Sequence, residues 1–153
     1  MKLILAILAL IAPAAASAAA GVTLESEVFV ERTTSDAAGK PKTILEAPKV
    51  VTPGDKLLFV ISYKNGAAEP ATGFVLTNPM PQAVAYAGSD ASGADVSVDG
   101  GKNWGALAAL RIANPDGTSR PAAQADVTHI RWRFSQAIPA GQGGKLSFRG
   151  TVR

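Results

Sequence analysis

Apolar and polar residues alternate along most of the chain after residue 20, and a period of two is typical of β-strands. Clusters of Gly, Pro, Asn and Asp separate the alternating runs, and no long stretch has the 3.6-residue period of an amphipathic helix. Many short strands without a long helix predict an all-β fold, an immunoglobulin-like β-sandwich of seven or more short strands. The expected strands cover residues 22–31, 43–46, 56–64, 73–78, 83–87, 127–134 and 145–153.

Two of these runs alternate most strongly and predict the centre of the core. Both faces of residues 56–64 carry apolar side chains, which favours a central strand. In residues 127–134, Ile130 and Trp132 share the parity that we expect to point inward. The Ala-rich residues 105–111 are compatible with either a strand or a helical turn, and the pattern does not decide between them.

The first 20 residues have the pattern of a secretory signal peptide. Lys2 gives a positive start, residues 3–12 are continuously apolar, and Pro13 and small residues follow. Cleavage sites of the A-x-A type end at Ala18 and at Ala20. The alternative is an uncleaved membrane anchor, which the short apolar core disfavours. We therefore expect an exported protein, periplasmic or secreted, without a stable membrane span after cleavage.

Composition removes several classes of chemistry. The chain has 153 residues, no Cys, one His and a formal net charge of +3. Without Cys, thiol catalysis, disulfides, iron–sulfur clusters and Cys-ligated zinc are excluded, and one His excludes multi-His metal sites. The small net charge does not indicate nucleic acid as a partner. We expect one domain over residues 21–153 after a signal peptide over residues 1–20, with no cofactor, no metal site and no catalytic residue.

The segment from Val51 to Gly66 carries a family resemblance. It contains a Pro53-Gly54-Asp55 turn, an alternating strand and Asn65-Gly66, and further along come Asn78 to Pro81, the Trp132 strand and Ala140-Gly141. This order resembles the conserved-repeat domain of bacterial cell-surface proteins, a domain of unknown function, over roughly residues 45–152. The resemblance implies an immunoglobulin-like sandwich without enzyme activity or cofactor. Members of that family occur as tandem arrays, whereas the pattern occurs once here.

One short motif predicts a structural turn. The residues from Ser97 to Trp104 fit S-x-D-x-G-x-x-W, which resembles the Asp-box of sialidases. Asp99 can accept backbone N–H groups across a tight turn, Gly101 can supply a positive φ, and Trp104 can pack back on the strand. The segment also begins like a calcium loop, but Ala106 stands where the bidentate Glu would be.

Basic side chains suggest one candidate ligand surface. If strands 127–134 and 145–153 pair, their outward faces collect a set of basic residues that could bind an anionic glycan or a lipid headgroup. That set is His129, Arg131, Arg133, Lys145, Arg149 and Arg153. The alternative is that the first strand, with Glu25, Glu27 and Glu31, lies beside the last strand and pairs these charges within one molecule. We expect this second arrangement, and with it a monomer.

These observations favour a non-enzymatic exported domain with a structural or binding role at the bacterial cell envelope. The partner stays open between an envelope protein and an anionic glycan or lipid headgroup. The alternative is a periplasmic carbohydrate-active or metal-binding protein. An enzyme should have a deep pocket with convergent polar groups, whereas a binding or structural module should expose strand edges or an apolar surface patch.

Overall fold

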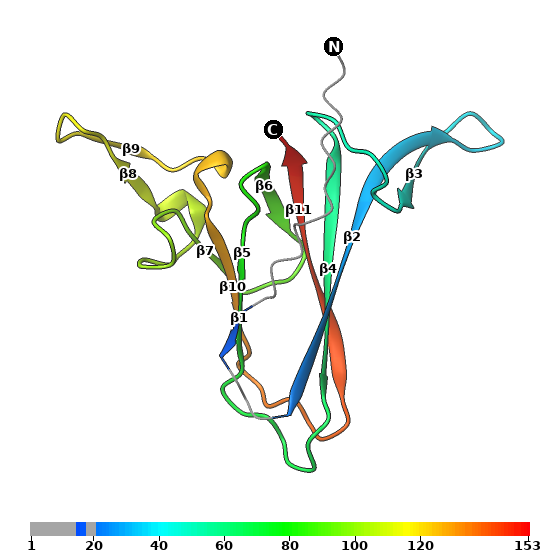
Figure 1. Cartoon of the computed structure of the whole chain (residues 1–153), viewed down its shortest axis with the longest axis vertical. Helices are drawn as coiled ribbons and strands as arrows, with labels where there is room; N and C mark the ends of the chain where they lie inside the picture. Colours follow the sequence, from blue (N-terminus) through cyan, green and yellow to red (C-terminus); the bar gives the residue numbers. More distant parts are fainter. Residues whose placement is uncertain (1–14, 18–20) are drawn as a thin grey trace.

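The computed structural model describes residues 15–17 and 21–153, which form two antiparallel sheets and a separate hairpin (Figure 1). Residues 1–14 and 18–20 of the predicted signal peptide lie outside the described residues, so the signal peptide stays a prediction. Residues 15–17 of that segment form a strand that pairs with Val75–Thr77, so cleavage after Ala18 or Ala20 would remove this strand from the smaller sheet. The strands are β1 (Ala15–Ser17), β2 (Val22–Ser35), β3 (Pro41–Glu46), β4 (Lys56–Asn65), β5 (Val75–Pro79), β6 (Val84–Ser89), β7 (Ala94–Ser97), β8 (Arg111–Ala113), β9 (Ser119–Pro121), β10 (His129–Arg133) and β11 (Gly143–Val152). Two 3-10 turns are η1 (Leu107–Ala109) and η2 (Gln124–Asp126). Within the described ranges, no helix is long and apolar enough to cross a membrane.

The larger sheet has the strand order β3-β2-β4-β11-β6, with β4 at its centre. This position agrees with the prediction for residues 56–64. On the inner face, Leu57 and Ile61 of β4 are 2% and 1% exposed. On the outer face, Leu58 and Val60 stay half-buried between their neighbours on β2 and β11.

The smaller sheet has the order β1-β5-β10-β7, and the β8–β9 hairpin stands apart from both sheets. In Figure 1 this hairpin and the β2–β3 hairpin project as two arms on opposite sides of the molecule. The Ala-rich segment 105–111 starts with a β-bridge at Gly105, forms the 3-10 turn η1 and then enters β8 at Arg111, so it contains a helical turn. The sequence pattern did not predict β8 or β9, because each has only three residues.

The inner faces of the two sheets meet in one aromatic core. Phe59 of β4 and Phe148 of β11 stack at 4.6 Å between ring centroids, and Trp132 of β10 lies 6.0 Å from Phe148. Leu76 and Ile130 of the smaller sheet are fully buried against them. The packed two-sheet arrangement confirms an all-β, sandwich-like fold.

The structure contains neither the expected pairing of the first and last strands nor the alternative pairing of 127–134 with 145–153. The strands at 127–134 and 145–153 do not pair, because β10 belongs to the smaller sheet and β11 to the larger one. The first and last strands are not neighbours either, since β4 lies between β2 and β11. Alternation indicates which side chains point inward, but it does not identify the neighbouring strand. The apolar faces of β10 and β11 contact each other across the core instead.

Candidate functional site

One side of β2 has no strand partner over much of its length among the described residues. β2 pairs with β4 from Val22 to Glu31, but with β3 only from Val30 to Ser35. Residues 22–29 therefore form an open edge of the larger sheet, which we call the β2 edge. An open edge presents a row of backbone N–H and C=O groups that can bond to another extended chain.

The side chains of the β2 edge divide by parity. Leu24 and Val28 are half-buried and pack against the core from the inner face. Glu25 and Glu27 lie on the opposite parity and are exposed on the outer face. The edge thus places Leu24 and Val28 on its inner face, with Ser26 between them, and Glu25 and Glu27 on its outer face, between Thr23 and Phe29. We call these the inner apolar row and the outer acidic row.

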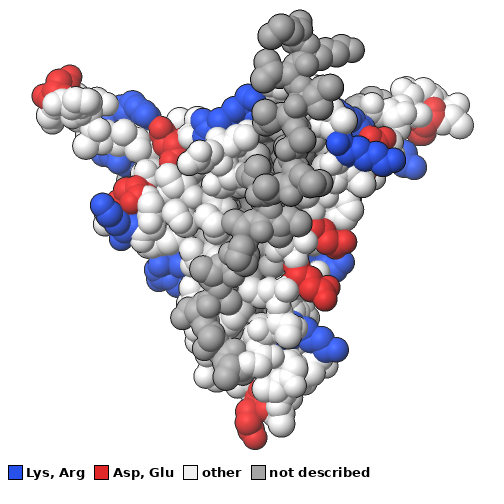
Figure 2. Space-filling view, in the orientation of Figure 1, with Lys and Arg blue, Asp and Glu red and all other residues white. Residues whose placement is uncertain are grey.

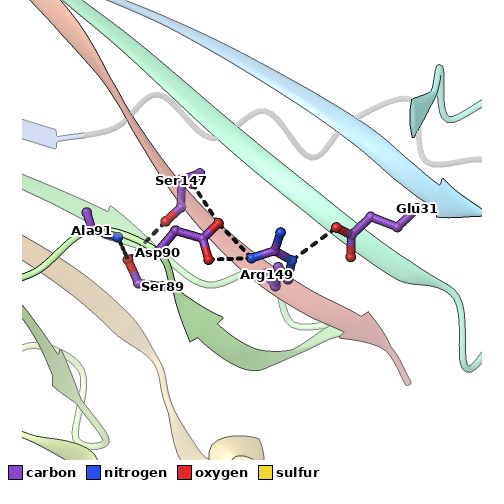
Figure 3. Close-up of polar contacts among 6 residues, drawn as sticks. All are labelled: Glu31, Ser89, Asp90, Ala91, Ser147 and Arg149. Atoms are coloured by element: carbon purple, nitrogen blue, oxygen red, sulfur yellow. Dashed lines mark hydrogen bonds and ion pairs between the residues drawn. The ribbon is translucent and has the colours of Figure 1, made fainter. Parts of the chain in front are cut away.

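A neighbouring acid on the same outer face is fully paired. Arg149 of β11 reaches across β4, and its Nε lies 3.0 Å from Oε1 of Glu31 on β2. The same guanidinium contacts both carboxylate oxygens of Asp90, as Figure 3 shows. The hydrogen bonds that Arg149 donates to Asp90 and to Glu31 raise the pKa of Arg149, and the bonds to Asp90 lower the pKa of Asp90. These groups hold β2, β11 and the loop after β6 together.

Glu25 and Glu27, unlike Glu31, are not paired with a described residue. Neither makes a hydrogen bond or an ion pair with any residue that the structure describes. Their register partners on β4 are Ser62 and Val60, which carry no charge. The two carboxylates on the β2 edge therefore make no short contact with a cation among the described residues, although Lys64 lines the same hollow as Glu25.

A hollow of about 350 Å³ adjoins the upstream end of this edge. Thr23 and Glu25 of β2, Lys64 of β4 and Gly143 of β11 contribute to its wall. Gly143 is required there, since a Cβ at that position would overlap the backbone carbonyl of Tyr63. The absence of a side chain on β11 leaves the outer face open beside the acidic row.

A second hollow of about 320 Å³ lies between the two sheets. Tyr63, Trp132, Phe134 and Leu146 form apolar walls, and residues 135–139 complete its rim. None of the described groups with a shifted pKa lines this hollow, and His129 is not part of it. Within the described ranges, no three His, Asp or Glu side chains are grouped closely enough to hold a metal ion.

The segment from Ser97 to Trp104 forms a tight turn, which is also tied to Thr128 just before β10 because the Gly100 N–H donates to the Thr128 hydroxyl. The Asp99 carboxylate accepts hydrogen bonds from the backbone and side chain of Asn103 and from the Ser97 hydroxyl, and these lower the pKa of Asp99 to about 2. Gly101 has a φ of +89° and accepts a 2.8 Å bond from the Trp104 indole. The bonds of Asp99 and Trp104 are internal to the turn, so the geometry gives it a structural role.

The candidate basic residues are divided between two sheets. His129, Arg131 and Arg133 lie on the outer face of the smaller sheet, because they alternate with the buried Ile130 and Trp132. The Arg131 guanidinium stacks 4.1 Å from the Trp104 ring, and Arg131 and Arg133 both face Asp95 at 3.3 and 3.8 Å.

The remaining basic residues lie elsewhere. Arg149 is paired on the larger sheet, Lys145 shares its outer parity, and Arg153 donates to the carbonyl of Ala125 at 2.7 Å. Acidic and basic groups are interspersed on the face seen in Figure 2. The six basic residues therefore do not form one surface. The sequence pattern missed their acidic partners Asp90 and Asp95, which lie in or beside short strands whose neighbours it did not identify.

Comparison of the chain with family models, curated proteins and solved structures finds no match. The resemblance to the conserved-repeat domain is thus supported only at the level of a small all-β domain with two antiparallel sheets.

Proposed function

We propose that this chain is an exported, non-enzymatic domain that binds a partner at the bacterial cell envelope, and that the β2 edge is its binding site. The observation that carries the proposal is the change of partner along β2. Among the described residues, the strand is paired on both sides at residues 30 and 31 and on one side only over residues 22–29. An exposed edge of this length is a common site for strand addition by another protein.

Several charged side chains elsewhere in the domain are bonded to structural partners, which supports a binding role rather than a catalytic one. Asp99 is saturated by hydrogen bonds within its own turn, and Arg149 is shared between Glu31 and Asp90. Asp126 is paired with Arg120, which lowers the pKa of Asp126 to about 2. These groups hold turns and strands in place, whereas Glu25 and Glu27 make no hydrogen bond or ion pair with any residue that the structure describes.

Export and the finer fold belong to the same proposal. The sequence of residues 1–20 supports export, because its positive start, apolar run and A-x-A sites have the order of a signal peptide. The two facing antiparallel sheets and the central Trp132 support an immunoglobulin-like arrangement.

Site-specific photo-crosslinking in cells that export the chain tests this function. A photoreactive residue replaces Thr23, which is exposed on the β2 edge, and in a matched variant it replaces Lys102, which is exposed on the turn of the other sheet. We expect discrete protein adducts from position 23 and not from position 102, on a chain whose N-terminus is near Ala19 or Gly21 by mass spectrometry. Identical adduct patterns at both positions, or a chain retaining Met1 in the membrane fraction, would contradict the proposal.

A further inference from the structure

We infer that the β2 edge recognises an extended segment of a partner protein in which basic and apolar side chains alternate, and that this segment is added as a strand to the larger sheet. The inference rests on the proposed function and specifies the chemistry of the partner. Three features of the edge lead to it: its free backbone groups, its inner apolar row and its outer acidic row.

The inner row requires apolar side chains from the added strand. Val30 lies beside β3 and is 2% exposed. Val28 and Leu24 have the same parity but lie beyond the end of β3, and both are only half-buried. A strand placed against residues 22–29 would cover them as β3 covers Val30. Since burial of such side chains is favourable, the added strand should carry apolar residues at alternate positions.

The outer row requires cations at the intervening positions. Glu25 and Glu27 lie two positions apart on one strand, so they match side chains with the same spacing on a neighbouring strand. Arg149 demonstrates that a guanidinium on this face can reach an acid two strands away, because it bonds to Glu31 across β4. A Lys or Arg on the directly adjacent strand has a shorter distance to cover.

The same charges disfavour a second copy of this chain as the occupant. In an antiparallel pair of two β2 edges related by a two-fold axis at Ser26, Glu25 of one copy would lie opposite Glu27 of the other. Like charges placed directly opposite each other destabilise a strand pair. In this register the charges therefore disfavour pairing between two copies and favour a strand of opposite charge.

A synthetic peptide tests the inference with the exported protein in solution. The probe is a fluorescein-labelled, end-capped heptapeptide in which Arg alternates with Val, and binding is measured by fluorescence anisotropy at low salt. Two further peptides carry N-methyl groups on the amides of one edge or of the other edge. A peptide with Glu in place of Arg and the polyamine spermine, as a competitor, control for charge.

We expect the Arg–Val peptide to bind and the Glu–Val peptide not to bind. Only one of the two N-methylated peptides should lose binding, because an added strand forms hydrogen bonds through only one of its edges. Spermine should compete weakly. The variants Glu25→Gln and Glu27→Gln should each weaken binding about two- to fivefold, the range of an exposed ion pair. The matched variant Glu69→Gln, at an exposed acid outside the edge, should leave affinity unchanged.

Other outcomes separate this inference from the proposed function. Equal binding of both N-methylated peptides, or complete competition by spermine, would mean charge attraction without strand addition and would overturn the inference. If no Arg–Val peptide binds while position 23 still crosslinks to a partner in cells, the basic-strand chemistry is wrong and the binding function stands. If both fail, the proposed function fails as well.

Discussion

Replacement of Trp132 by Ala should be among the most destabilising single changes in the domain. Trp132 is 2% exposed at the centre of the smaller sheet, with Leu76 and Ala94 as its register partners on β5 and β7, and its ring lies 6.0 Å from that of Phe148. Truncation of a buried aromatic side chain costs about 3–5 kcal/mol of unfolding free energy. That is a large part of the roughly 5–15 kcal/mol typical of a domain. At about 3–4 °C per kcal/mol for a domain of this size, the melting temperature should fall by roughly 10–20 °C.

The companion variant Trp132→Phe separates packing from hydrogen bonding. The Trp132 Nε1–H is buried without a hydrogen-bond partner among the described residues. An unsatisfied buried donor costs about 1–3 kcal/mol, so its removal offsets part of the packing free energy that the smaller Phe side chain loses. We expect a net loss of under about 1.5 kcal/mol for Trp132→Phe.

Urea unfolding followed by far-ultraviolet circular dichroism measures both variants without relying on tryptophan fluorescence. Leu45→Ala is the matched control, because Leu45 is 49% exposed and its loss should change the free energy of unfolding by no more than about 0.5 kcal/mol. A Trp132→Ala protein that unfolds with the wild-type midpoint would refute the packing of β10 against β11.

Three further changes test other parts of the structure. Asn65→Ala should lower the free energy of unfolding, measured in urea, by about 2–4 kcal/mol. The fully buried Asn65 side chain donates to the carbonyls of Glu69 and Ile138 and accepts from the Ala67 amide, and unchanged stability would contradict these bonds. Gly143→Ala should lower the melting temperature, because the added Cβ overlaps the Tyr63 carbonyl. Gly66→Ala should not, because its Cβ would make only an ordinary contact with the Gly21 carbonyl at 3.5 Å; equal effects would contradict the β4–β11 register. The pKa of Asp99 is about 2 in the folded protein, below its usual value of 3.8. The ionised carboxylate therefore stabilises the fold fully above about pH 4, and this contribution is lost as the pH falls through 2. Asp99→Asn should lower stability at neutral pH and flatten the acid limb of a pH–stability curve, and an unchanged limb would be inconsistent with this turn.

The sequence predicts the inward faces of the strands well, because side-chain parity is a local property. The alternation around Ile61 and around Trp132 identifies residues that are buried at 1% and 2% exposure. The turn at Asp99 is also local, since its carboxylate bonds to residues at most four positions away. The three-residue strands β8 and β9 are too short to give a pattern.

Strand neighbours depend on distant residues, and here the sequence misleads. The charges of Arg149 and Glu31 suggest adjacent first and last strands, and the two side chains do meet, but they do so across β4. The β2 edge could not be predicted either. It exists because β3 pairs with only the last part of β2, and no residue in 22–29 marks that limit.

Residue-resolved amide hydrogen exchange of the exported protein, with and without the Arg–Val peptide, tests strand addition at the β2 edge most directly. Strand addition predicts that the amides of residues 22–29 that point away from β4 become protected when the peptide is present. Those that already bond to β4 should change little, as should the amides of β7 in the other sheet. Unchanged exchange along residues 22–29 at saturating peptide, or equal protection spread over both sheets, would contradict binding at this edge.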